Sequence, residues 1–386
     1  MEEALQRAQE LIAVYEQELR AELPEGADIF DAHVHLGDDI DGMKGRFDEL
    51  ITGMDKYGVS RAFMFCLDEP DRQPAFRAAN DRTLAYAERS NGRLIPFVRL
   101  DLTEEPLEEA KRALDLGARG IKLHPRAQRF MLNDERLAPV FQLSAERRVP
   151  ILIHGGRGLP PIADHLRRLV DANPDAQLII AHAGIADLGN LAACFAGKRG
   201  VFFDTSVWSA VDLLDFLHLV PPEQVVYASD YPYGRQPNSL LLALRTARIA
   251  GFTDKEVLDM LAGNANRIAD GEEALEPSNP RGRPTFQQTM VYARIHQYLS
   301  MATPLLWTRQ PDTIGVLGLA LNATEERNGR PDELARIREL LVTAREIWRG
   351  LPESETDDDR LEASRATARL IHLADILSIT ADATTS

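Results

Sequence analysis

The chain has 386 residues, of which 44% are hydrophobic and 27% are charged, so it can bury a full core and is neither disordered nor fibrous in composition. Its 44 Lys and Arg residues against 60 Asp and Glu residues give a net charge of −16. This charge opposes a general attraction to nucleic acid or to an anionic membrane, so we expect neither as a partner. An anionic small molecule would need a local basic patch.

Residues 1–26 are predicted to form an acidic, amphipathic helix. This stretch lacks the basic start and apolar centre of a signal peptide, and no run in the chain is long enough to span a membrane. The two cysteines, Cys66 and Cys194, lie in apolar contexts without a CxxC spacing, which indicates buried, reduced thiols. We therefore expect a cytoplasmic location.

From residue 27 onward, eight short apolar runs alternate with helix-like stretches. The runs are rich in β-branched and aromatic residues and cover residues 27–37, 61–67, 94–102, 118–125, 150–156, 176–184, 201–206 and 225–232. Strand alternating with helix predicts an α/β fold with parallel strands, and eight such units over about 240 residues match a (β/α)8 TIM barrel, here residues 27–271. A doubly wound open sheet is the alternative, which is disfavoured because no G-x-G-x-x-G follows the first run.

The first run ends in DAHVHLG, residues 31–37, with His33 and His35 two positions apart. Residues i and i+2 of a strand face the same way, so the two imidazoles would project together, with Asp31 one step deeper on that face. The pair is either part of a metal site or two imidazoles in a strand, and by itself it does not decide. Asp31 could orient a ligand histidine or make a structural hydrogen bond.

Polar residues recur at the carboxyl ends of later runs. Lys122 and His124 end the fourth run, His154 the fifth, His182 the sixth and Asp230 the eighth. The strand ends of a (β/α)8 barrel meet at one face, and neutral imidazoles with one carboxylate suit a divalent ion, Zn²⁺ foremost, with Mn²⁺ or Fe²⁺ as alternatives. The remaining four histidines are predicted to be ordinary helix residues: His165, His218, His296 and His372.

Five motifs in chain order resemble the amidohydrolase superfamily, specifically its amidohydrolase-related branch of metal-dependent hydrolases and decarboxylases. They are HVH on the first run, GIKLHP on the fourth, ILIHGG on the fifth, IIAHAG on the sixth and YASDYP on the eighth. The segment MLAGNANRI is similar to the helix that closes the barrel in that branch, and the likeness runs from Asp28 to Ile268.

This resemblance implies a site. In mononuclear members of the branch the matching positions bind one divalent metal ion, which here selects His33, His35, His154 and Asp230. His182 is then implied as the general acid/base, so that His182 and Asp230 are the expected catalytic residues. Dinuclear members bridge two ions with a carboxylated lysine on the fourth strand, a role that Lys122 could fill. On ligand count we expect one ion.

The predicted reaction is hydrolysis of an amide, ester or lactone by metal-activated water, with His182 passing a proton to the leaving group. The main alternative is non-oxidative decarboxylation of a hydroxy-arene carboxylate, which the same ligands would serve. The resemblance associates that reaction with longer, aromatic-rich loops, whereas this chain is only 6% aromatic. A third hypothesis is a non-catalytic binding protein on a barrel scaffold, which the complete ligand set disfavours.

Arginines follow three of the strand ends, where loops line the mouth of a barrel: Arg126 and Arg129 after the fourth run, Arg157 after the fifth and Arg235 after the eighth. An arginine binds a carboxylate with two parallel hydrogen bonds, so a small organic acid or its lactone is the expected substrate, although loop arginines are also often solvated. Tyr231 and Tyr233 flank Asp230 and either shape the pocket or pack. The predicted substrate-binding residues are Lys122, His124, Arg126, Arg157, Tyr233 and Arg235.

Residues 272–386 are predicted to be an all-helical extension. A Pro/Gly-rich linker at 272–284 precedes amphipathic helices at 285–306, 331–350 and 358–378. The middle helix carries one apolar stripe, formed by Leu334, Ile337, Leu340, Leu341, Ala344, Ile347 and Trp348. The stripe must be buried by the barrel, in a separate bundle or against a second chain, so we expect a packing or dimerisation role, with a homo-oligomer through these helices as the candidate assembly. We expect the active-site mouth to be made wholly by residues before 240.

Overall fold

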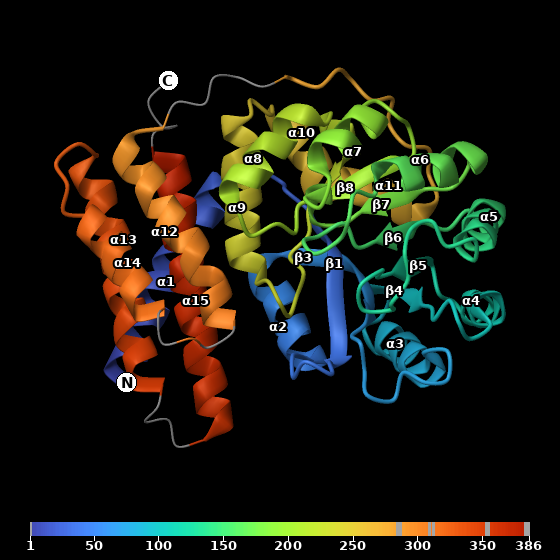
Figure 1. Cartoon of the computed structure of the whole chain (residues 1–386), viewed down its shortest axis with the longest axis horizontal. Coiled ribbons are helices and arrows are strands. Elements are labelled where there is room, and N and C mark those ends of the chain that lie inside the picture. The colour runs from blue at the N-terminus through green and yellow to red at the C-terminus, as the bar shows by residue number, and fades with distance from the viewer. Residues whose placement is uncertain (1, 283–287, 308–309, 311–312, 352–355, 382–386) are drawn as a thin grey trace.

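A nine-stranded sheet organises the larger part of this computed structural model, which describes residues 2–282, 288–307, 310, 313–351 and 356–381 (Figure 1). The strand order is β2-β1-β3-β4-β5-β6-β7-β8-β9, and every pairing is parallel except the antiparallel β1–β2 hairpin. The strands are β1 (Ile29–Asp38), β2 (Lys44–Gly45), β3 (Val59–Cys66), β4 (Leu94–Arg99), β5 (Gly120–Leu123), β6 (Ile151–Ile153), β7 (Leu178–Ile180), β8 (Val201–Asp204) and β9 (Val225–Val226).

The segment after β9 returns to β1. The Ala32 N–H donates to the Tyr227 carbonyl at 2.9 Å, and the His35 N–H donates to the Tyr231 carbonyl at 2.7 Å. The eight parallel strands therefore curl round to their starting point, which confirms the predicted (β/α)8 barrel. Each of the eight predicted apolar runs overlaps one of the parallel strands, although β1 and β3 extend beyond their runs.

Both faces of these strands are buried, which explains why the runs read as continuous apolar stretches. In β6, Leu152 packs in the barrel interior, while its neighbours Ile151 and Ile153 pack outward against the helical layer. In β7, Ile179 occupies the same interior layer. Alternation of side chains along a strand thus serves two apolar cores rather than one core and solvent.

The alternation in β1 changes phase before the histidines. Phe30 and Ala32 belong to the interior core, whereas Val34 and Leu36 belong to the outer one. A shift in the β1–β3 register lies between Asp31 and Val34. The prediction that Asp31 shares a face with His33 and His35 is therefore wrong, because this irregularity reverses which side chains point inward.

Helices surround the barrel. They are α2 (Phe47–Tyr57), α3 (Arg77–Arg89), α4 (Pro106–Asp115), α5 (Leu137–Arg147), α6 (Ala163–Ala172), α7 (Leu188–Phe195), α8 (Ala210–Leu219), α9 (Gln236–Ile249), α10 (Asp254–Leu258) and α11 (Asn264–Asp270). The last of them, α11, packs on the interior core of the barrel through Ala265 and Ile268. Among the helices of the described ranges, none is long and apolar enough to cross a membrane.

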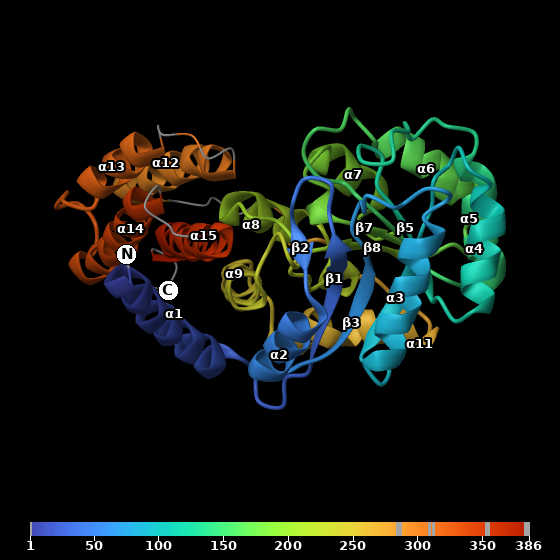
Figure 2. The ribbon, with the colours of Figure 1, turned by 90° about the horizontal axis from the view of Figure 1, so that it is seen from below.

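A bundle of helices stands beside the barrel. It contains α12 (Met290–Trp307), α13 (Thr313–Ala323), α14 (Pro331–Gly350) and α15 (Asp357–Thr380), and the N-terminal helix α1 (Glu2–Glu22) packs against α14 and α15 (Figure 2). The predicted extension is confirmed as helical, while α13 was not predicted. Residues 283–287, which hold the end of the predicted linker and the start of its first helix, lie outside the described residues.

The apolar stripe of α14 is buried inside this bundle. Ile337, Leu341 and Ile347 are fully buried, chiefly where α14 packs on α15. Packing within the chain thus accounts for the stripe, and dimerisation through it stays a prediction. The other face of α15 packs on α8 and α9, so the bundle is fixed against the barrel next to the carboxyl ends of its last strands.

Candidate functional site

Three side chains at the ends of β1 and β9 point at one another and form what we call the metal group: His33, His35 and Asp230. The two Nε2 atoms lie 3.2 Å apart, and each is 3.3 Å from Asp230 Oδ1. Burial is the main cause that lowers the pKa of both His33 and His35 well below the ordinary value, which keeps the imidazoles neutral. Two neutral imidazoles and a carboxylate that share a small volume are a donor set for a divalent ion.

Asp204, at the end of β8, fixes the tautomer of His33. Its Oδ2 lies 2.7 Å from His33 Nδ1, and because a carboxylate only accepts, Nδ1 carries the proton. The lone pair of His33 is therefore on Nε2, which faces His35 and Asp230. A carboxylate that orients a ligand histidine is a common support for a bound metal. The structure gives this role to Asp204 and not to Asp31.

Asp31 instead holds the loop that carries Asp230. It accepts hydrogen bonds from the Ser229 N–H at 2.9 Å and the Ser229 hydroxyl at 2.6 Å, and a further one from Gln236 at 3.1 Å. Complete burial raises the pKa of Asp31 to about 6. Asp230 itself has a φ of 58°, a conformation that non-glycine residues rarely adopt and that needs such support. The structural hydrogen-bond hypothesis for Asp31 is thus confirmed.

A second chain of hydrogen bonds links His154 and His182. The carbonyl oxygen and the hydroxyl oxygen of Ser206 each lie 2.9 Å from His182 Nδ1. A carbonyl oxygen only accepts, and the Ser206 hydroxyl already donates its proton to Asp204 at 2.5 Å, so both oxygens accept from His182. His182 Nδ1 therefore carries the proton, and its Nε2 accepts from His154 Nδ1 at 3.0 Å. This leaves the lone pair of His154 on Nε2, the nitrogen that remains available as a ligand.

The structure places His154 in the same cleft as the metal group, but His154 is not a member of that group. Its ring lies between the rings of His124 and His182. Its plane is stacked on His124 with centroids 3.9 Å apart. Gly156 allows this arrangement, since a Cβ at that position would come within 2.9 Å of both His154 Nε2 and His182 Cδ2. Three of the four predicted ligands thus meet in the structure. The fourth, His154, is separated from them by the ring of His182.

Lys122 lies beside the metal group. Its Nζ is 3.2 Å from His33 Nε2 and 4.4 Å from the centre of the Phe65 ring, and the side chain is fully buried. Burial lowers the pKa of Lys122 to about 7. Lys122 is therefore adjacent to the metal group, and its predicted role as a bridge between two ions stays a prediction.

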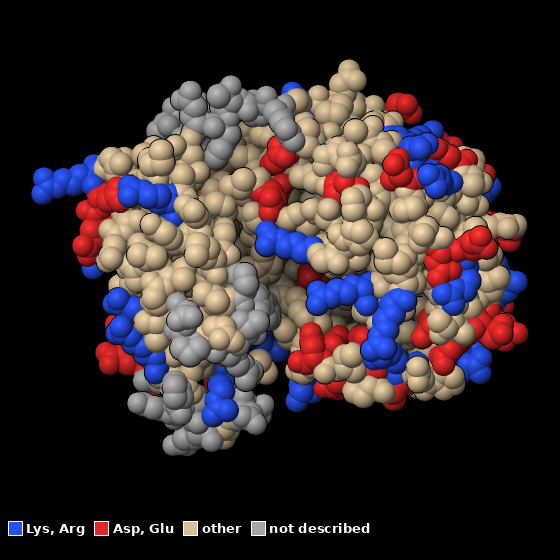
Figure 3. Space-filling model, viewed as in Figure 1, with Lys and Arg blue, Asp and Glu red and all other residues tan. Residues whose placement is uncertain are grey.

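A cavity of about 500 Å³ opens from the metal group on the side of β4 and β5, and we call it the arginine lobe. Its wall contains His124, Tyr233, the arginines Arg72, Arg99, Arg126, Arg129 and Arg157, and the carboxylates Asp39, Asp41 and Asp68, of which Asp68 pairs with Arg72. Figure 3 shows Lys and Arg side chains around a hollow between the barrel and the bundle. Within the described part of the chain, Arg126 and Arg129 form no ion pair, which leaves their charges free for a ligand.

Arg99 is a functional candidate that the sequence reasoning missed. It ends β4, its side chain is 2% exposed, and one guanidinium nitrogen donates to the Cys66 carbonyl at 3.2 Å. Its Nε has no hydrogen-bond partner among the described residues. Asp68 on the same cavity wall attracts Arg99 electrostatically, but no ion pair joins the two side chains among the described residues. The guanidinium is therefore only partly compensated, and an anion in the cavity would stabilise it. Its place at a strand end, like that of His154, is the signal that could have identified it.

Arg235 does not lie where it was predicted. Its guanidinium pairs with Glu49 of α2 and packs 5.4 Å from the centre of the Tyr231 ring. It lines neither cavity of the cleft. The prediction that Arg235 binds substrate is corrected here, because an acidic partner on the neighbouring helix holds the side chain outside the mouth.

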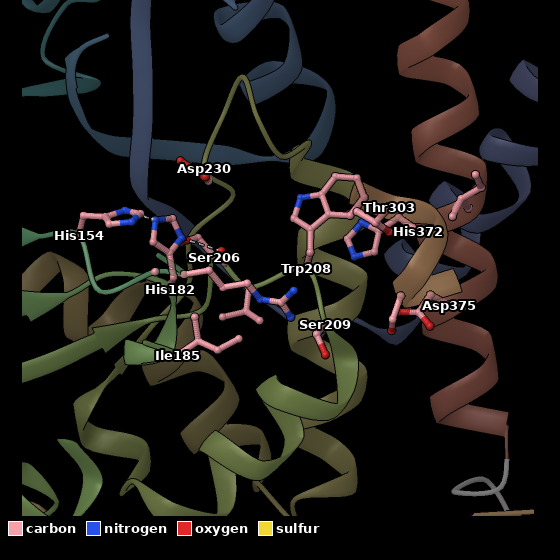
Figure 4. Close-up of a pocket in the computed structure, with 15 residues that line it drawn as sticks. His154, His182, Ile185, Ser206, Trp208, Ser209, Asp230, Thr303, His372 and Asp375 are labelled. Atoms are coloured by element: carbon pink, nitrogen blue, oxygen red, sulfur yellow. Dashed lines mark hydrogen bonds between the residues drawn. The ribbon is translucent and has the colours of Figure 1, made fainter. Parts of the chain in front are cut away.

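A second cavity of about 410 Å³ opens from the metal group toward the bundle, and we call it the bundle lobe (Figure 4). It shares His154, His182, Arg157 and Asp230 with the arginine lobe, so the two lobes form one cleft. The expectation that residues before 240 make the whole mouth is wrong, because α12 and α15 supply part of this wall: Ser300, Thr303, Ile371, His372 and Asp375.

Comparisons with known proteins agree with this geometry. The profile of the family described as amidohydrolase matches residues 30–268. A TIM-barrel protein from Bordetella bronchiseptica, titled uncharacterised, aligns with a TM-score of 0.50 and 14% identity over 63% of this chain and 99% of its own. A probable 2-pyrone-4,6-dicarboxylic acid hydrolase from Acinetobacter baumannii aligns with a TM-score of 0.49 and 13% identity over 63% and 99%.

An apo IDCase from Metarhizium anisopliae aligns with a TM-score of 0.47 and 17% identity, over 64% of this chain and 98% of its own. No curated protein matched the sequence. The Bordetella bronchiseptica structure thus supports the barrel fold, and the residues matched by the family profile stop before α12 begins.

Proposed function

The chain belongs to the amidohydrolase family and is an enzyme of that superfamily, and on this premise we propose that it is a metal-dependent hydrolase. Its substrate is a small molecule that carries a carboxylate and an amide, ester or lactone bond. The observation that carries the proposal is the convergence of the metal group, the hydrogen-bonded His154 and His182, and the arginine lobe on one cleft.

His33, His35 and Asp230 would hold one divalent ion, with His154 as the fourth ligand through its Nε2. The neutral imidazoles and the fixed tautomer of His33 fit this role. An ion bound there supplies a Lewis acid that polarises a substrate carbonyl and lowers the pKa of water, and Zn²⁺ suits this donor set best. Lys122 would bridge a second ion only if the chain binds two.

His182 is the proposed general acid/base. Its Nδ1 proton is held by Ser206, so its Nε2 has the accepting lone pair, and His182 lies outside the metal group. In hydrolysis, the hydrogen bond from His154 Nδ1 to His182 Nε2 breaks, and the freed Nε2 takes a water proton while the water oxygen bonds to the carbonyl carbon. The bond from carbon to the leaving oxygen or nitrogen then breaks, and His182 returns the proton to that atom.

The arginine lobe is the proposed site for the substrate carboxylate. Arg99 and Arg126 offer guanidinium groups that form no direct ion pair among the described residues, although Asp68 lies near Arg99, and Tyr233 and His124 close the wall. A bidentate arginine–carboxylate contact would fix the orientation of the reacting bond relative to the metal group.

A broad activity screen tests this proposal. The protein loaded with Zn²⁺ or Mn²⁺ is assayed on carboxylate-bearing esters, amides and lactones, with titration of released acid and separate measurement of CO₂. We expect acid release that a chelator abolishes and added ion restores, and elemental analysis that gives one ion per chain. Release of CO₂ without hydrolysis would assign the decarboxylase reaction instead. Tight binding without turnover of any compound would assign the binding-protein hypothesis.

A further inference from the structure

The bundle lobe is lined mostly by apolar surface, whereas nearly half of the surface of the arginine lobe is polar. Ile185 and Val207 come from the barrel, and Ile371 comes from α15. A cavity of about 150 Å³ already accommodates benzene, so a lobe of about 410 Å³ has room for an aromatic ring and a short linker. The lobe therefore fits an apolar group of substrate size.

A flat aromatic surface forms one wall. Trp208 follows β8, and its indole stacks on the His372 ring of α15 with centroids 4.5 Å apart and planes 10° from parallel (Figure 4). His372 is buried, and one of its ring nitrogens bonds to the backbone of Trp208. The histidine thus fixes the plane of the indole, and Trp208, which is only half-buried, lines the lobe. A fixed indole is a stacking surface for a planar group.

A polar cluster closes the far end. His296 Nδ1 lies 2.7 Å from Asp375 Oδ1, and Ser300 Oγ lies 3.4 Å from His296 Nε2. This is the order of a Ser–His–Asp triad, but Ser300 lies inside α12, where backbone N–H groups are used by helix hydrogen bonds. Ser300 therefore lacks the free N–H donors of an oxyanion hole, so the cluster is not a second catalytic site, and its Ser300 and Asp375 serve as part of the lobe's wall.

The position of the lobe gives it a role. It meets the arginine lobe at His154, His182 and Asp230, so a substrate with its reacting bond at the metal group has one arm in each lobe. The arm in the arginine lobe carries the carboxylate, and the other arm faces Trp208. Because the family profile ends at residue 268, the wall made by α12 and α15 belongs to the part of this chain beyond the matched region.

We propose that the bundle lobe is a specificity site for a planar apolar group, such as a phenyl ring, attached to the substrate on the side of the reacting bond opposite its carboxylate. Trp208 stacks on this group, and Thr303 and Ile371 of the bundle limit its length. The inference rests on the proposed function for the position of the reacting bond, whereas binding of the ring itself does not need turnover.

The test compares 4-phenylbutyrate with butyrate, two carboxylates without a hydrolysable bond, by calorimetric titration of the full-length, Zn²⁺-loaded protein. We expect 4-phenylbutyrate to bind roughly 30-fold more tightly, the effect of burying one phenyl ring. Benzyl alcohol, which lacks a carboxylate, should bind weakly and compete with 4-phenylbutyrate. Equal affinity of the two carboxylates would overturn the proposal.

Two variants localise the effect. Thr303→Trp fills the lobe and should remove the preference for 4-phenylbutyrate while leaving butyrate binding unchanged. Trp208→Leu keeps an apolar wall without the stacking plane and should reduce the preference roughly fivefold. The matched control is Met301→Trp, because Met301 is on the same helix but 51% exposed, and it should retain the full preference. A preference that survives Thr303→Trp would place the ring elsewhere and overturn the proposal.

The outcomes separate this inference from the proposed function. A preference that Thr303→Trp abolishes, in a protein that hydrolyses nothing in the activity screen, supports the specificity site and removes the hydrolase proposal. Hydrolysis that is chelator-sensitive, in a protein that binds the two carboxylates equally, supports the hydrolase and removes the specificity site.

Discussion

The arginine lobe and the bundle lobe meet at the same metal group but are built in different ways. Barrel segments alone line the arginine lobe, and they bring five arginines. The bundle lobe combines Trp208 of the barrel with Thr303 and His372 of the bundle, and its surface is mostly apolar. Under the proposed function, the barrel would supply the chemistry and the anion site, while the appended helices would add a surface that selects the apolar group of the substrate.

The largest effect should come from the shared metal group. The double substitution His33→Ala and His35→Ala removes two of the three side chains of the metal group and leaves only Asp230. We expect loss of the bound ion and a fall in activity of at least about 10³-fold, since such an ion stabilises the transition state by several kcal/mol. Elemental analysis and steady-state kinetics measure both effects. His165→Ala on α6 is the control, and an active, metal-free double variant would contradict the site.

His182→Asn should separate proton transfer from metal binding. The variant keeps the metal group intact but removes the accepting Nε2, so we expect the ion to be retained and kcat to fall by about 10²–10⁴-fold. Binding of 4-phenylbutyrate should change much less than kcat, because His182 is only one of the many residues that line the two lobes. If the variant loses its ion instead, His182 is a ligand, and the dinuclear arrangement with Lys122 gains support.

The strands and the rim histidines could be predicted because both depend on local pattern. Eight apolar runs identified the barrel, and a barrel brings its strand ends together whatever the loops do, so His33, His154 and Asp230 were predicted to share one cleft. The sequence pattern could not show the phase change in β1, because a register shift between Asp31 and Val34 leaves the alternation of residue types unaltered.

Contacts between distant segments were beyond the sequence pattern. The stripe on α14 predicted burial but not its partner, and nothing local in Thr303 or His372 indicates that their helices reach the metal group. Arg235 was predicted in the mouth because it follows a strand end, but Glu49, which is distant in sequence, sets its direction. The position of a side chain at a strand end is therefore predictable, whereas the partner that orients it is not.

Asp204→Asn tests the support of the metal group. The amide keeps the shape of the side chain but loses the carboxylate that holds the Nδ1 proton of His33 and the Ser206 hydroxyl. We expect metal affinity to fall by about 10–100-fold, the usual effect of removing such a support. Competition with a metal-binding dye measures it. Unchanged affinity would mean that His33 is held in place by packing alone.

A pair of arginine substitutions tests the anion site. Arg99→Gln removes a buried guanidinium from the wall of the arginine lobe and should weaken butyrate binding about tenfold, the effect of losing a hydrogen bond to a charged group. Arg235→Gln removes an arginine that follows a strand end but pairs with Glu49, and it should leave butyrate binding unchanged. Calorimetric titration checks both, and a larger effect at Arg235 would reverse the assignment.

The smallest predicted effect is a pH dependence of stability that comes from the bundle side of the cleft. Burial lowers the pKa of His372 to about 4 from an ordinary value of 6.5, so the unfolded chain binds a proton at this residue more readily than the folded one. Above pH 6.5 His372 is neutral in both states and does not affect the free energy of unfolding. As the pH falls from 6.5 toward 4, His372 takes up a proton only in the unfolded chain, so the free energy of unfolding decreases. The loss is about 1.4 kcal/mol at pH 5.5.

His372→Phe keeps a ring against Trp208 and removes the titrating group, so the drop in unfolding free energy between pH 8 and pH 5.5, measured in urea, should be smaller by about that amount in the variant. An identical drop in both proteins would mean that His372 takes up its proton without unfolding, and the rigid aromatic wall assigned to the bundle lobe would then be too loose to select a planar group.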